Sequence, residues 1–381
     1  MSVVRYHRLL QSFIDYIFMK ILQITGMHST KFGGLEKYFL EMAEILNKRG
    51  DSLYLVYNSK PNSEEYISEL KKNNAEIIVA DLNGTNTIKI AINLIKIIKK
   101  VKPDFVHLHF GKVARNCFFI PQLMGYKTYR TLHSLLVFNP KTKFLSALRY
   151  KPMHLFYNKV LTVSSAIKKE LLKVSYFKEE QVLVRYIGTN IENNITRNVS
   201  TNKEINICCI AFHNHIKGID ILIDALYLLK TKYNYNNFKL TEIGGDNDEY
   251  KKLLEEQVKR LNLENEITFY GLSNNIPQLL AQMDIYVQPS RNEGIGLALM
   301  EAATQELPLV GSEIGGIPEV IDDGVNGFLF PVGDCEKLAE KLHYLCTNSQ
   351  EREKMGKWSR KIVEERFDLK TNTRQLVEEI Y

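Results

Sequence analysis

The sequence predicts an α/β protein built from two doubly wound, Rossmann-like domains. Its 381 residues exceed the usual size of one domain, so two domains of roughly 190 residues are expected. Short apolar runs alternate with stretches of helical period along both halves of the chain, a pattern typical of parallel sheets covered by helices on both faces. A polar stretch, residues 192–203 (ENNITRNVSTNK), separates the two series and has the composition of a linker.

The first series begins at Met19. Short buried strands are expected where apolar residues run together, at 21–25, 53–57, 76–80, 105–109, 128–132, 159–163 and 182–186. Helical periodicity lies between several of them, at 35–49 and 88–100. Residues 1–18 mix basic and apolar side chains at roughly helical spacing. An upstream start codon, an added surface helix and an interfacial membrane helix all fit this segment.

The second series repeats the alternation. Strands are expected at 205–211, 239–243, 267–270, 284–287, 307–310 and 327–330, with helices at 218–233 and up to residue 261. The segment 335–381 reads as helical and charged throughout. We therefore assign 1–192 to an N-terminal domain, 193–203 to a linker, 204–360 to a C-terminal domain and 361–381 to a helix that could pack back on the first domain. Two such domains are expected to place a ligand cleft at the carboxyl ends of their strands.

Charge is divided unevenly along the chain. Residues 1–200 carry 30 Lys and Arg against 15 Asp and Glu, whereas residues 201–381 carry 20 against 29. The stretch 105–169 holds 11 basic residues and no acidic one. Such a field attracts polyanions or an anionic membrane surface, although a solvated basic face is the alternative. No recognised nucleic-acid-binding motif accompanies it, so no nucleic-acid partner is expected.

Other bulk features indicate a cytoplasmic protein, peripheral at most on the inner face of the membrane. No apolar run reaches the ~18 residues of a membrane-spanning helix, and no signal-peptide pattern opens the sequence. The five cysteines are odd in number and form no C-x-x-C pair, which favours reduced thiols.

The strongest motif is RNEGIGLALMEA, residues 291–302. It follows the expected strand 284–287 and opens a helix, where free backbone N–H groups and the positive helix end suit a diphosphate. Glu293 lies in the loop before the helix and Glu301 about two turns into it. Carboxylates suit sugars because each oxygen accepts a hydrogen bond from a hydroxyl. A pair of surface glutamates on an ordinary helix is the alternative.

This motif resembles that of the retaining GT-B glycosyltransferases of family 4, whose hallmark is Glu-x7-Glu within E-G-[FI]-G-[LI]-x-x-x-E-A. The resemblance implies the GT-B fold, with two Rossmann-like domains facing a central cleft. It also implies that Glu293 holds the donor sugar at the catalytic centre and that Glu301 holds the nucleotide ribose. The backbone amides of Gly294, Ile295 and Gly296 would lie near the sugar and the diphosphate.

The resemblance continues upstream in the second half. It implies that Lys217, at the mouth of the helix expected after strand 205–211, binds the donor diphosphate. Relatives carry an Arg five or six residues earlier, where this chain has Ala211 and Phe212, and His213 is the nearest substitute. Positions that usually line the nucleotide pocket are matched by Gly244, Gly245, Tyr270 and Gly271.

In the first half the resemblance is looser. Gly33 and Gly34 precede the helix 35–49, where the family has a Gly-rich loop close to donor and acceptor, although a plain left-handed turn also explains them. His133 ends the strand 128–132 and matches the active-site histidine beside the donor sugar, while a structural role is the alternative. His107 and His109 alternate on one strand and could line the cleft or coordinate an ion.

No metal or cofactor is expected. Asp246-Asn247-Asp248 resembles the D-x-D metal motif of another glycosyltransferase class, but its place at a helix start favours helix capping. In the family that this chain resembles, a lysine and helix dipoles take the role of the cation.

The resemblance implies a retaining, metal-independent hexosyltransferase. The donor would be a nucleotide sugar, a UDP-hexose or UDP-N-acetylhexosamine, with GDP-mannose not excluded. The acceptor would be a glycan or a polyprenyl-diphosphate-linked sugar in capsule, O-antigen or exopolysaccharide synthesis. Two other classes remain open: a nucleotide-sugar epimerase of the same architecture, and a catalytically silent glycan-binding protein, since Phe212 stands near the place of the Arg.

Overall fold

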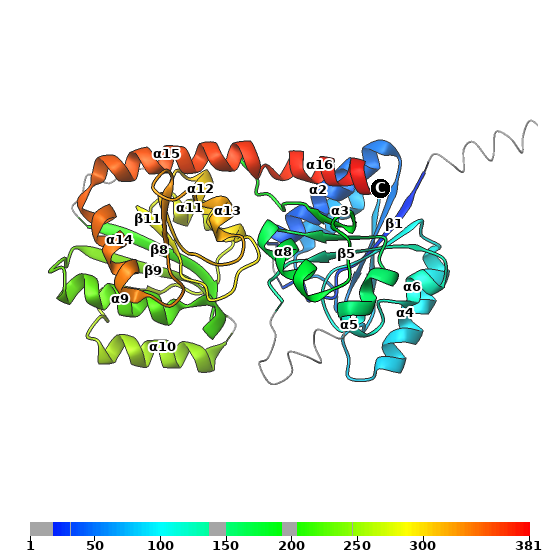
Figure 1. Cartoon of the computed structure of the whole chain (residues 1–381), viewed down its shortest axis with the longest axis horizontal. Helices are drawn as coiled ribbons and strands as arrows, with labels where there is room; N and C mark the ends of the chain where they lie inside the picture. The colour runs from blue at the N-terminus through cyan, green and yellow to red at the C-terminus, as the bar shows by residue number, and fades with distance from the viewer. Residues whose placement is uncertain (1–17, 31, 137–149, 193–203, 246) are drawn as a thin grey trace, which may run out of the picture. The chain divides into compact units, whose positions relative to one another are not determined.

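The computed structural model describes residues 18–30, 32–136, 150–192, 204–245 and 247–381 and divides the chain into two compact units (Figure 1). The first unit holds the described residues up to Val163, Ile167–Arg185 and Lys370–Tyr381; the second holds Ser164–Ala166 and Tyr186–Leu369. The expected linker, 193–203, and residues 1–17 of the N-terminal segment lie outside the described residues.

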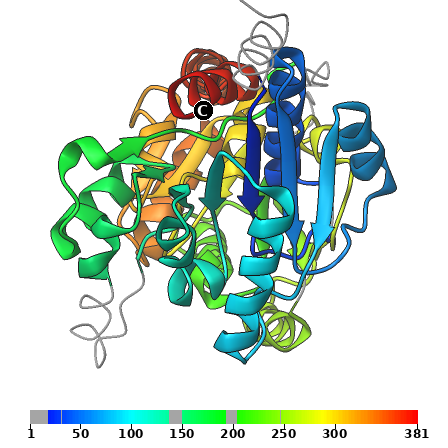
Figure 2. The ribbon, with the colours of Figure 1, turned by 90° about the vertical axis from the view of Figure 1, so that its right-hand side faces the viewer.

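The first unit is built on a seven-stranded parallel sheet with the order β3-β2-β1-β4-β5-β6-β7. Figure 2 shows its blue strands β1, β2 and β3 side by side. The strands are β1 (Lys20–Ile24), β2 (Ser52–Tyr57), β3 (Ala75–Val79), β4 (Phe105–Leu108), β5 (Lys127–Leu132), β6 (Lys159–Thr162) and β7 (Val182–Val184). The order reverses between β1 and β4, and ligands of such sheets bind beyond the carboxyl ends of the strands at that point.

Helices and short 3-10 turns connect these strands. They are α2 (Gly34–Arg49), α3 (Glu64–Lys72), α4 (Thr87–Val101), α5 (Val113–Asn116), α6 (Ile120–Leu123), η1 (Lys151–Leu155), α8 (Ser165–Val174) and η2 (Glu179–Gln181). Gly33 is the N-cap of α2, and its amide donates to the Glu36 carboxylate at 3.1 Å. This bond satisfies one of the amides left free at the helix start.

The second unit repeats the design on a six-stranded parallel sheet with the order β10-β9-β8-β11-β12-β13. Its strands are β8 (Ile205–Phe212), β9 (Phe238–Gly245), β10 (Ile267–Phe269), β11 (Ile285–Gln288), β12 (Leu309–Ser312) and β13 (Gly327–Phe330). The other elements are η3 (His215–Lys217), α9 (Ile219–Thr231), α10 (Asp248–Arg260), α11 (Ile276–Leu280), α12 (Leu297–Thr304), α13 (Ile317–Val320), α14 (Cys335–Thr347) and α15 (Ser349–Arg366). Two doubly wound sheets confirm the predicted fold class.

The charged segment expected at 335–381 forms three helices, of which the last is α16 (Leu369–Ile380). Just before α16, a β-bridge in the second unit joins Thr189 to Asp368. The Thr189 amide donates to the Phe367 carbonyl at 2.8 Å, and the Leu369 amide donates to the Thr189 carbonyl at 3.0 Å. From Lys370 onward the chain belongs to the first unit. Within the described ranges, no helix is both long and apolar enough to cross a bilayer.

Candidate active site

The sheet of the second unit places two charged side chains at its switch point. Lys217 follows β8 and Glu293 follows β11, the neighbouring strands between which the order reverses. Lys217 Nζ donates to Glu293 Oε2 at 2.9 Å, and the two side chains are 23% and 13% exposed. The pair is shielded but still reachable, as a binding site for an anionic ligand requires.

Several donors hold the Glu293 carboxylate in place. Gln288 Nε2 and Ser290 Oγ each donate to Oε2 at 3.3 Å, and the Gly294 amide donates to Oε1 at 3.1 Å. Gln288 is itself fixed, because the Tyr286 hydroxyl donates to its carbonyl oxygen at 2.7 Å. A carboxylate already oriented by its neighbours needs little rearrangement when a ligand binds.

Arg291 joins the loop of Lys217 to the loop of Glu293. Its guanidinium binds the Asp220 carboxylate with two bonds, of 2.7 and 2.6 Å, and donates to the His215 carbonyl at 2.8 Å. Such bidentate, charge-assisted pairs are among the stronger polar contacts in proteins. Sequence reasoning missed both Arg291 and Asp220 as site residues, because nothing in the sequence pairs positions that are 71 residues apart.

The motif residues lie where the sequence predicted them, on the turn and helix after β11. Gly296 is the N-cap of α12 with a φ of 88°, and Ile295 beside it is buried. Glu301 lies half-buried on α12. The roles of Gly294, Ile295, Gly296 and Glu301 toward a donor stay predictions.

His213, the nearest substitute for the missing Arg, is engaged inside the protein. Its Nε2 lies 2.9 Å from Glu242 Oε2, and both residues are buried. Burial raises the pKa of the Glu242 carboxyl. Since the His213 side chain is buried whereas that of Lys217 remains 23% exposed, Lys217 is the better-placed cation for a phosphate.

Exposed aromatic side chains gather at the carboxyl edge of this sheet. Phe212 ends β8, is 42% exposed and pairs in register with Gly245 at the end of β9. Tyr270, 52% exposed, follows β10, and the next residue, Gly271, accepts a hydrogen bond at its carbonyl from the Gly244 amide at 3.1 Å. Aromatic faces of this kind can stack on a nucleobase.

The first unit presents Gly33 and Gly34 at the start of α2 and His133 directly after β5. The His133 ring is half-buried, stacks on Phe110 at 4.3 Å and lies 2.9 Å, nitrogen to nitrogen, from His109. Burial lowers the pKa of His133 to about 3, and the Arg130 guanidinium adds to the shift. The imidazole is therefore neutral at physiological pH.

His107 and His109 are buried, and each ring nitrogen of both has a hydrogen-bond partner within the protein. In the structure both rings are thus engaged within the protein, and the ion-ligand alternative stays untested. Over the described ranges, no group of three or more His, Cys, Asp or Glu side chains is arranged to hold a metal ion. Asp246 lies outside those ranges, while Asn247 caps α10 by accepting from the Tyr250 amide at 3.0 Å.

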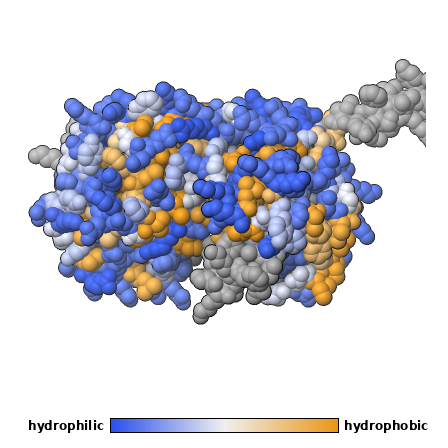
Figure 3. Space-filling model, viewed as in Figure 1, coloured by the Kyte–Doolittle hydropathy of each residue, from blue (hydrophilic) through white to orange (hydrophobic). Residues whose placement is uncertain are grey.

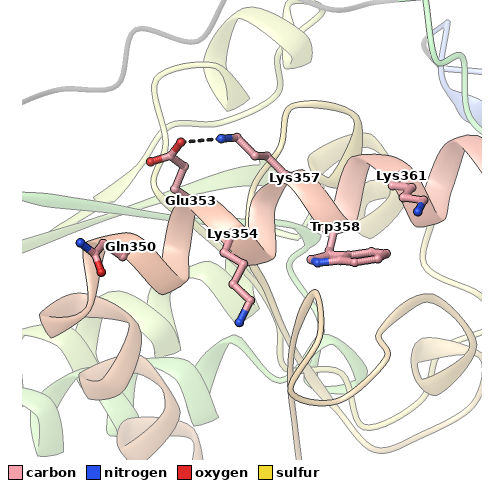
Figure 4. A pocket seen from close by; sticks show the side chains of 6 residues that line it. All are labelled: Gln350, Glu353, Lys354, Lys357, Trp358 and Lys361. Carbon is pink, nitrogen blue, oxygen red and sulfur yellow. Dashed lines mark hydrogen bonds and ion pairs between the residues drawn. The ribbon is translucent and has the colours of Figure 1, made fainter.

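A separate surface hollow lies along α15 (Figure 4). Its lining comes from one helix: Gln350, Glu353, Lys354, Lys357, Trp358 and Lys361. Lys361 Nζ lies 4.5 Å from the centre of the Trp358 ring, and Lys357 pairs with Glu353 at 2.6 Å. None of the residues predicted for the site belongs to it.

Two family models match the chain, "Glycosyltransferase Family 4" over residues 32–193 and "Glycosyl transferases group 1" over residues 190–362. One model therefore falls on each of the two consecutive halves, and each half carries one parallel sheet of the fold. The fold is of the GT-B type, and the two halves of the chain match glycosyltransferase domains.

Relatives and solved structures agree with this class. N-acetyl-alpha-D-glucosaminyl L-malate synthase of Bacillus anthracis is 30% identical over 199 residues, 52% of this chain and 50% of that protein. The capsular polysaccharide biosynthesis glycosyltransferase CapM of Staphylococcus aureus is 23% identical over 354 residues, 85% of this chain and 88% of CapM. Anabaena Alr3699/HepE, solved with UDP and glucose, has a TM-score of 0.79 at 22% identity, covering 95% of this chain and 99% of that one. The chain spans between 50% and 64% of the length of three curated relatives, the Bacillus synthase among them.

Proposed function

We propose that this chain is a retaining, metal-independent hexosyltransferase of family 4. It moves a hexose or N-acetylhexosamine from a nucleotide sugar to a glycan or a lipid-linked acceptor. The observation that carries the proposal is the Lys217–Glu293 pair at the switch point of the second sheet, followed by Glu301 on the next helix.

In this proposal the second unit binds the donor. Lys217 and the amides of residues 294–296 before α12 meet the diphosphate, because an ammonium and backbone N–H groups both favour phosphate charge. Glu293 accepts from hydroxyls of the sugar, and Glu301 from hydroxyls of the ribose. The HepE structures with UDP, UDP-glucose and glucose support a uridine nucleotide as the first candidate.

The proposed reaction retains configuration through attack on the same face that the diphosphate leaves. The acceptor oxygen bonds to the anomeric carbon while the bond from that carbon to the diphosphate oxygen breaks. The acceptor's proton passes to the departing diphosphate, so no separate base is required. The electrons of the broken bond stay on the diphosphate, whose charge Lys217 stabilises.

The first unit is proposed to bind the acceptor, a polyprenyl-diphosphate-linked sugar at the inner face of the cytoplasmic membrane. The match to CapM supports a place in the synthesis of a surface polysaccharide. A hydrophobic area over α4 and α6 (Figure 3) holds four exposed apolar side chains, Ile88, Ile92, Phe119 and Leu123. Helix α4, which holds Ile88 and Ile92, also carries exposed lysines at Lys89, Lys96, Lys99 and Lys100. Apolar side chains flanked by lysines favour an anionic lipid surface.

The donor site is tested by titrating the protein with UDP, GDP and ADP and with their sugar conjugates, by calorimetry, without and then with divalent metal. We expect one nucleotide to bind in the micromolar range without metal and to lose at least about 10-fold in affinity in Glu301→Ala, because the ribose loses a charged acceptor. Glu264→Ala is the control and should bind like the wild type, because Glu264 is an exposed glutamate that precedes β10, at the other edge of the same sheet.

Phe212 favours one alternative, a GT-B protein that binds glycans without catalysis. Near the position where the family has a phosphate-binding Arg, this chain has an exposed aromatic ring, which could instead stack on a sugar. Absence of binding to every nucleotide would reject the transferase and move this alternative to the front. Turnover of a nucleotide sugar without any acceptor would instead indicate an epimerase.

A further inference from the structure

One continuous chain of hydrogen bonds crosses the interior of the first unit. Its members lie on or directly after the neighbouring strands β1, β4 and β5, except for Tyr381, which follows α16. Helix α16 itself lies beside α2 (Figure 1). In order they are His133, His109, Gln23, Tyr381, His107 and Thr131. The chain ends at one side on the predicted active-site histidine, and the transferase mechanism proposed above makes no use of its other members.

The individual contacts are short. His133 Nε2 lies 2.9 Å from His109 Nδ1, and His109 Nε2 lies 2.6 Å from Gln23 Oε1. The Gln23 amide nitrogen lies 2.8 Å from the Tyr381 hydroxyl, which in turn contacts His107 Nδ1. His107 Nε2 closes the series 2.8 Å from Thr131 Oγ1.

Gln23 sets the direction of this chain. Its amide nitrogen also lies 3.2 Å from Met42 Sδ, a weak acceptor that suits an N–H group and disfavours a carbonyl oxygen. The carbonyl oxygen of Gln23 therefore faces His109, where it can only accept. His109 must carry its hydrogen on Nε2. Because burial lowers the pKa of His109 well below its ordinary value, the ring is neutral and its Nδ1 is an acceptor.

The tautomer of His133 follows from that of His109. Since His109 Nδ1 accepts, His133 Nε2 carries a hydrogen and donates it. The neutral His133 ring then has a bare lone pair on Nδ1, and no partner for Nδ1 occurs in the part of the chain that the structure describes. The nitrogen left over is thus an acceptor, suited to a hydroxyl group of a sugar.

Tyr381 completes the arrangement from the other side. Its hydroxyl accepts from the Gln23 amide and donates to His107 Nδ1, whose ring then donates to Thr131. Burial raises the pKa of Tyr381 well above its ordinary value, so the hydroxyl keeps its proton. Tyr381 thereby gives the amide a strong acceptor on the side where its hydrogens lie.

We infer that Gln23 and Tyr381 are positioning residues, which act through His109 to hold His133 as the Nε2–H tautomer with Nδ1 open to a sugar hydroxyl. The structural half of this inference stands on the contacts and on the neutrality of the two buried rings. The catalytic half rests on the proposed function and on the predicted place of His133 beside the donor sugar.

Gln23→Leu tests the inference most directly. Without the carbonyl oxygen, a hydrogen on His109 Nε2 would be buried with no acceptor, so His109 should move it to Nδ1 and donate to His133. His133 should then carry its hydrogen on Nδ1 and lose the free acceptor. Long-range 1H–15N NMR of the ring nitrogens distinguishes the two tautomers in substrate-free protein. We expect kcat to fall about 10-fold, as for one hydrogen bond lost in the transition state, with the nucleotide-sugar KM nearly unchanged.

Tyr381→Phe is the second variant, in case Gln23→Leu folds poorly, because it keeps the ring and removes only the hydroxyl. We expect a mixture of both His133 tautomers and a fall in kcat of about 3-fold, since the amide keeps only its weak sulfur acceptor. Tyr57→Phe is the matched control. It removes another buried hydroxyl of this unit, bonded to Tyr66 at 2.8 Å, and should change neither readout.

The outcomes separate the two proposals. A wild-type His133 protonated on Nδ1, or an unchanged tautomer and kcat in both variants, would overturn the inference. A wild type that binds no nucleotide but shows His133 protonated on Nε2 would reject the transferase and leave the structural half of the inference standing. A changed tautomer with unchanged kcat would reject the catalytic half alone.

Discussion

At the scale of single residues, burial decides the charge of three histidines in the first unit. Desolvation lowers the pKa of His107 and of His133 to about 3 each and that of His109 well below its ordinary value. Neighbouring charges add to these shifts, His133 for His107 and Arg130 for His133. In the unfolded chain, each ring would take up a proton near the ordinary value of about 6.5. Protonation therefore favours the unfolded state as the pH falls.

This linkage predicts that acid destabilises the protein through these rings. Below about pH 6.5 the unfolded chain binds more protons than the folded one, so stability is present above that pH and is lost toward about pH 3. Each histidine contributes a slope of up to about 1.4 kcal/mol per pH unit within this window. His107→Gln should remove one such contribution. The difference in the free energy of unfolding between the wild type and this variant should therefore shrink as the pH falls. Urea unfolding between about pH 7 and about pH 5, followed by circular dichroism, measures this difference. A difference that stays constant with pH would contradict the assignment.

Residue-level prediction from sequence reaches as far as the chemistry is local and stops where it is not. Lys217 and Glu293 were predicted one by one from short motifs, and the structure brings them to 2.9 Å. The bond between Gln23 and Tyr381 joins positions 358 residues apart, and no periodicity or motif signals such a pair. The hydrogen-bond partners of His107 and His109 could not be predicted for the same reason, because they come from other parts of the chain.

At the scale of elements, alternating apolar runs predicted the strands to within a few residues. The expected strand 205–211 is β8, Ile205–Phe212, and the expected 327–330 is β13, Gly327–Phe330. Strands buried on both faces read as short apolar runs, and this makes them visible in a sequence. The boundary expected between residues 360 and 361 falls inside α15, and the chain returns to the first unit only at Lys370. The breaks between α14, α15 and α16 were not predicted, because a charged stretch of continuous helical composition shows neither Gly nor Pro where the helices end.

The turn before α9 depends on a glycine, which leads to a prediction at this scale. Gly218 has a φ of 69°, and a Cβ there would lie 1.9 Å from the Pro289 carbonyl oxygen. Gly218→Ala should therefore strain the turn and displace Lys217, which precedes it. We expect a loss of stability above about 2 kcal/mol and a loss of nucleotide binding, measured by thermal unfolding and calorimetry.

Gly324→Ala is the control for this turn. Gly324 also has a positive φ, 75°, but a Cβ there meets nothing within 4 Å. The backbone cost alone, about 1 to 2 kcal/mol, should apply, with nucleotide affinity unchanged. Equal effects of the two substitutions would show that the close approach to Pro289 does not matter for the site.

At the scale of the whole molecule, the two halves of the chain differ in net charge, and the chain crosses between the two units. The first 200 residues carry the excess of Lys and Arg and the remaining 181 the excess of Asp and Glu. The chain passes between the units more than once, since Ser164–Ala166 belong to the second and Lys370–Tyr381 return to the first. Each unit has its own sheet and core, so a change on the surface of the first should leave nucleotide binding by the second unaffected.

This division gives a prediction about membranes. The apolar residues on α4 and α6, flanked by lysines, should bring the protein to vesicles that contain anionic lipid, in a co-sedimentation assay. Binding should fall when salt is raised from about 0.15 M to about 1 M, because the screening length shrinks from about 8 Å to about 3 Å. Ile92→Glu should weaken binding at both salt concentrations, since it puts a negative charge among the apolar side chains.

Leu253→Glu provides the matched control, because Leu253 is an exposed leucine, 59% accessible, on α10 of the acidic unit. It should pellet with vesicles like the wild type, and both variants should keep nucleotide affinity. If Ile92→Glu and Leu253→Glu pellet alike, α4 is not the lipid-binding surface. Electrostatic attraction is strongest at low salt. If the wild type does not pellet with anionic vesicles even there, this surface does not bring the protein to the membrane, and a soluble glycan becomes the acceptor to test.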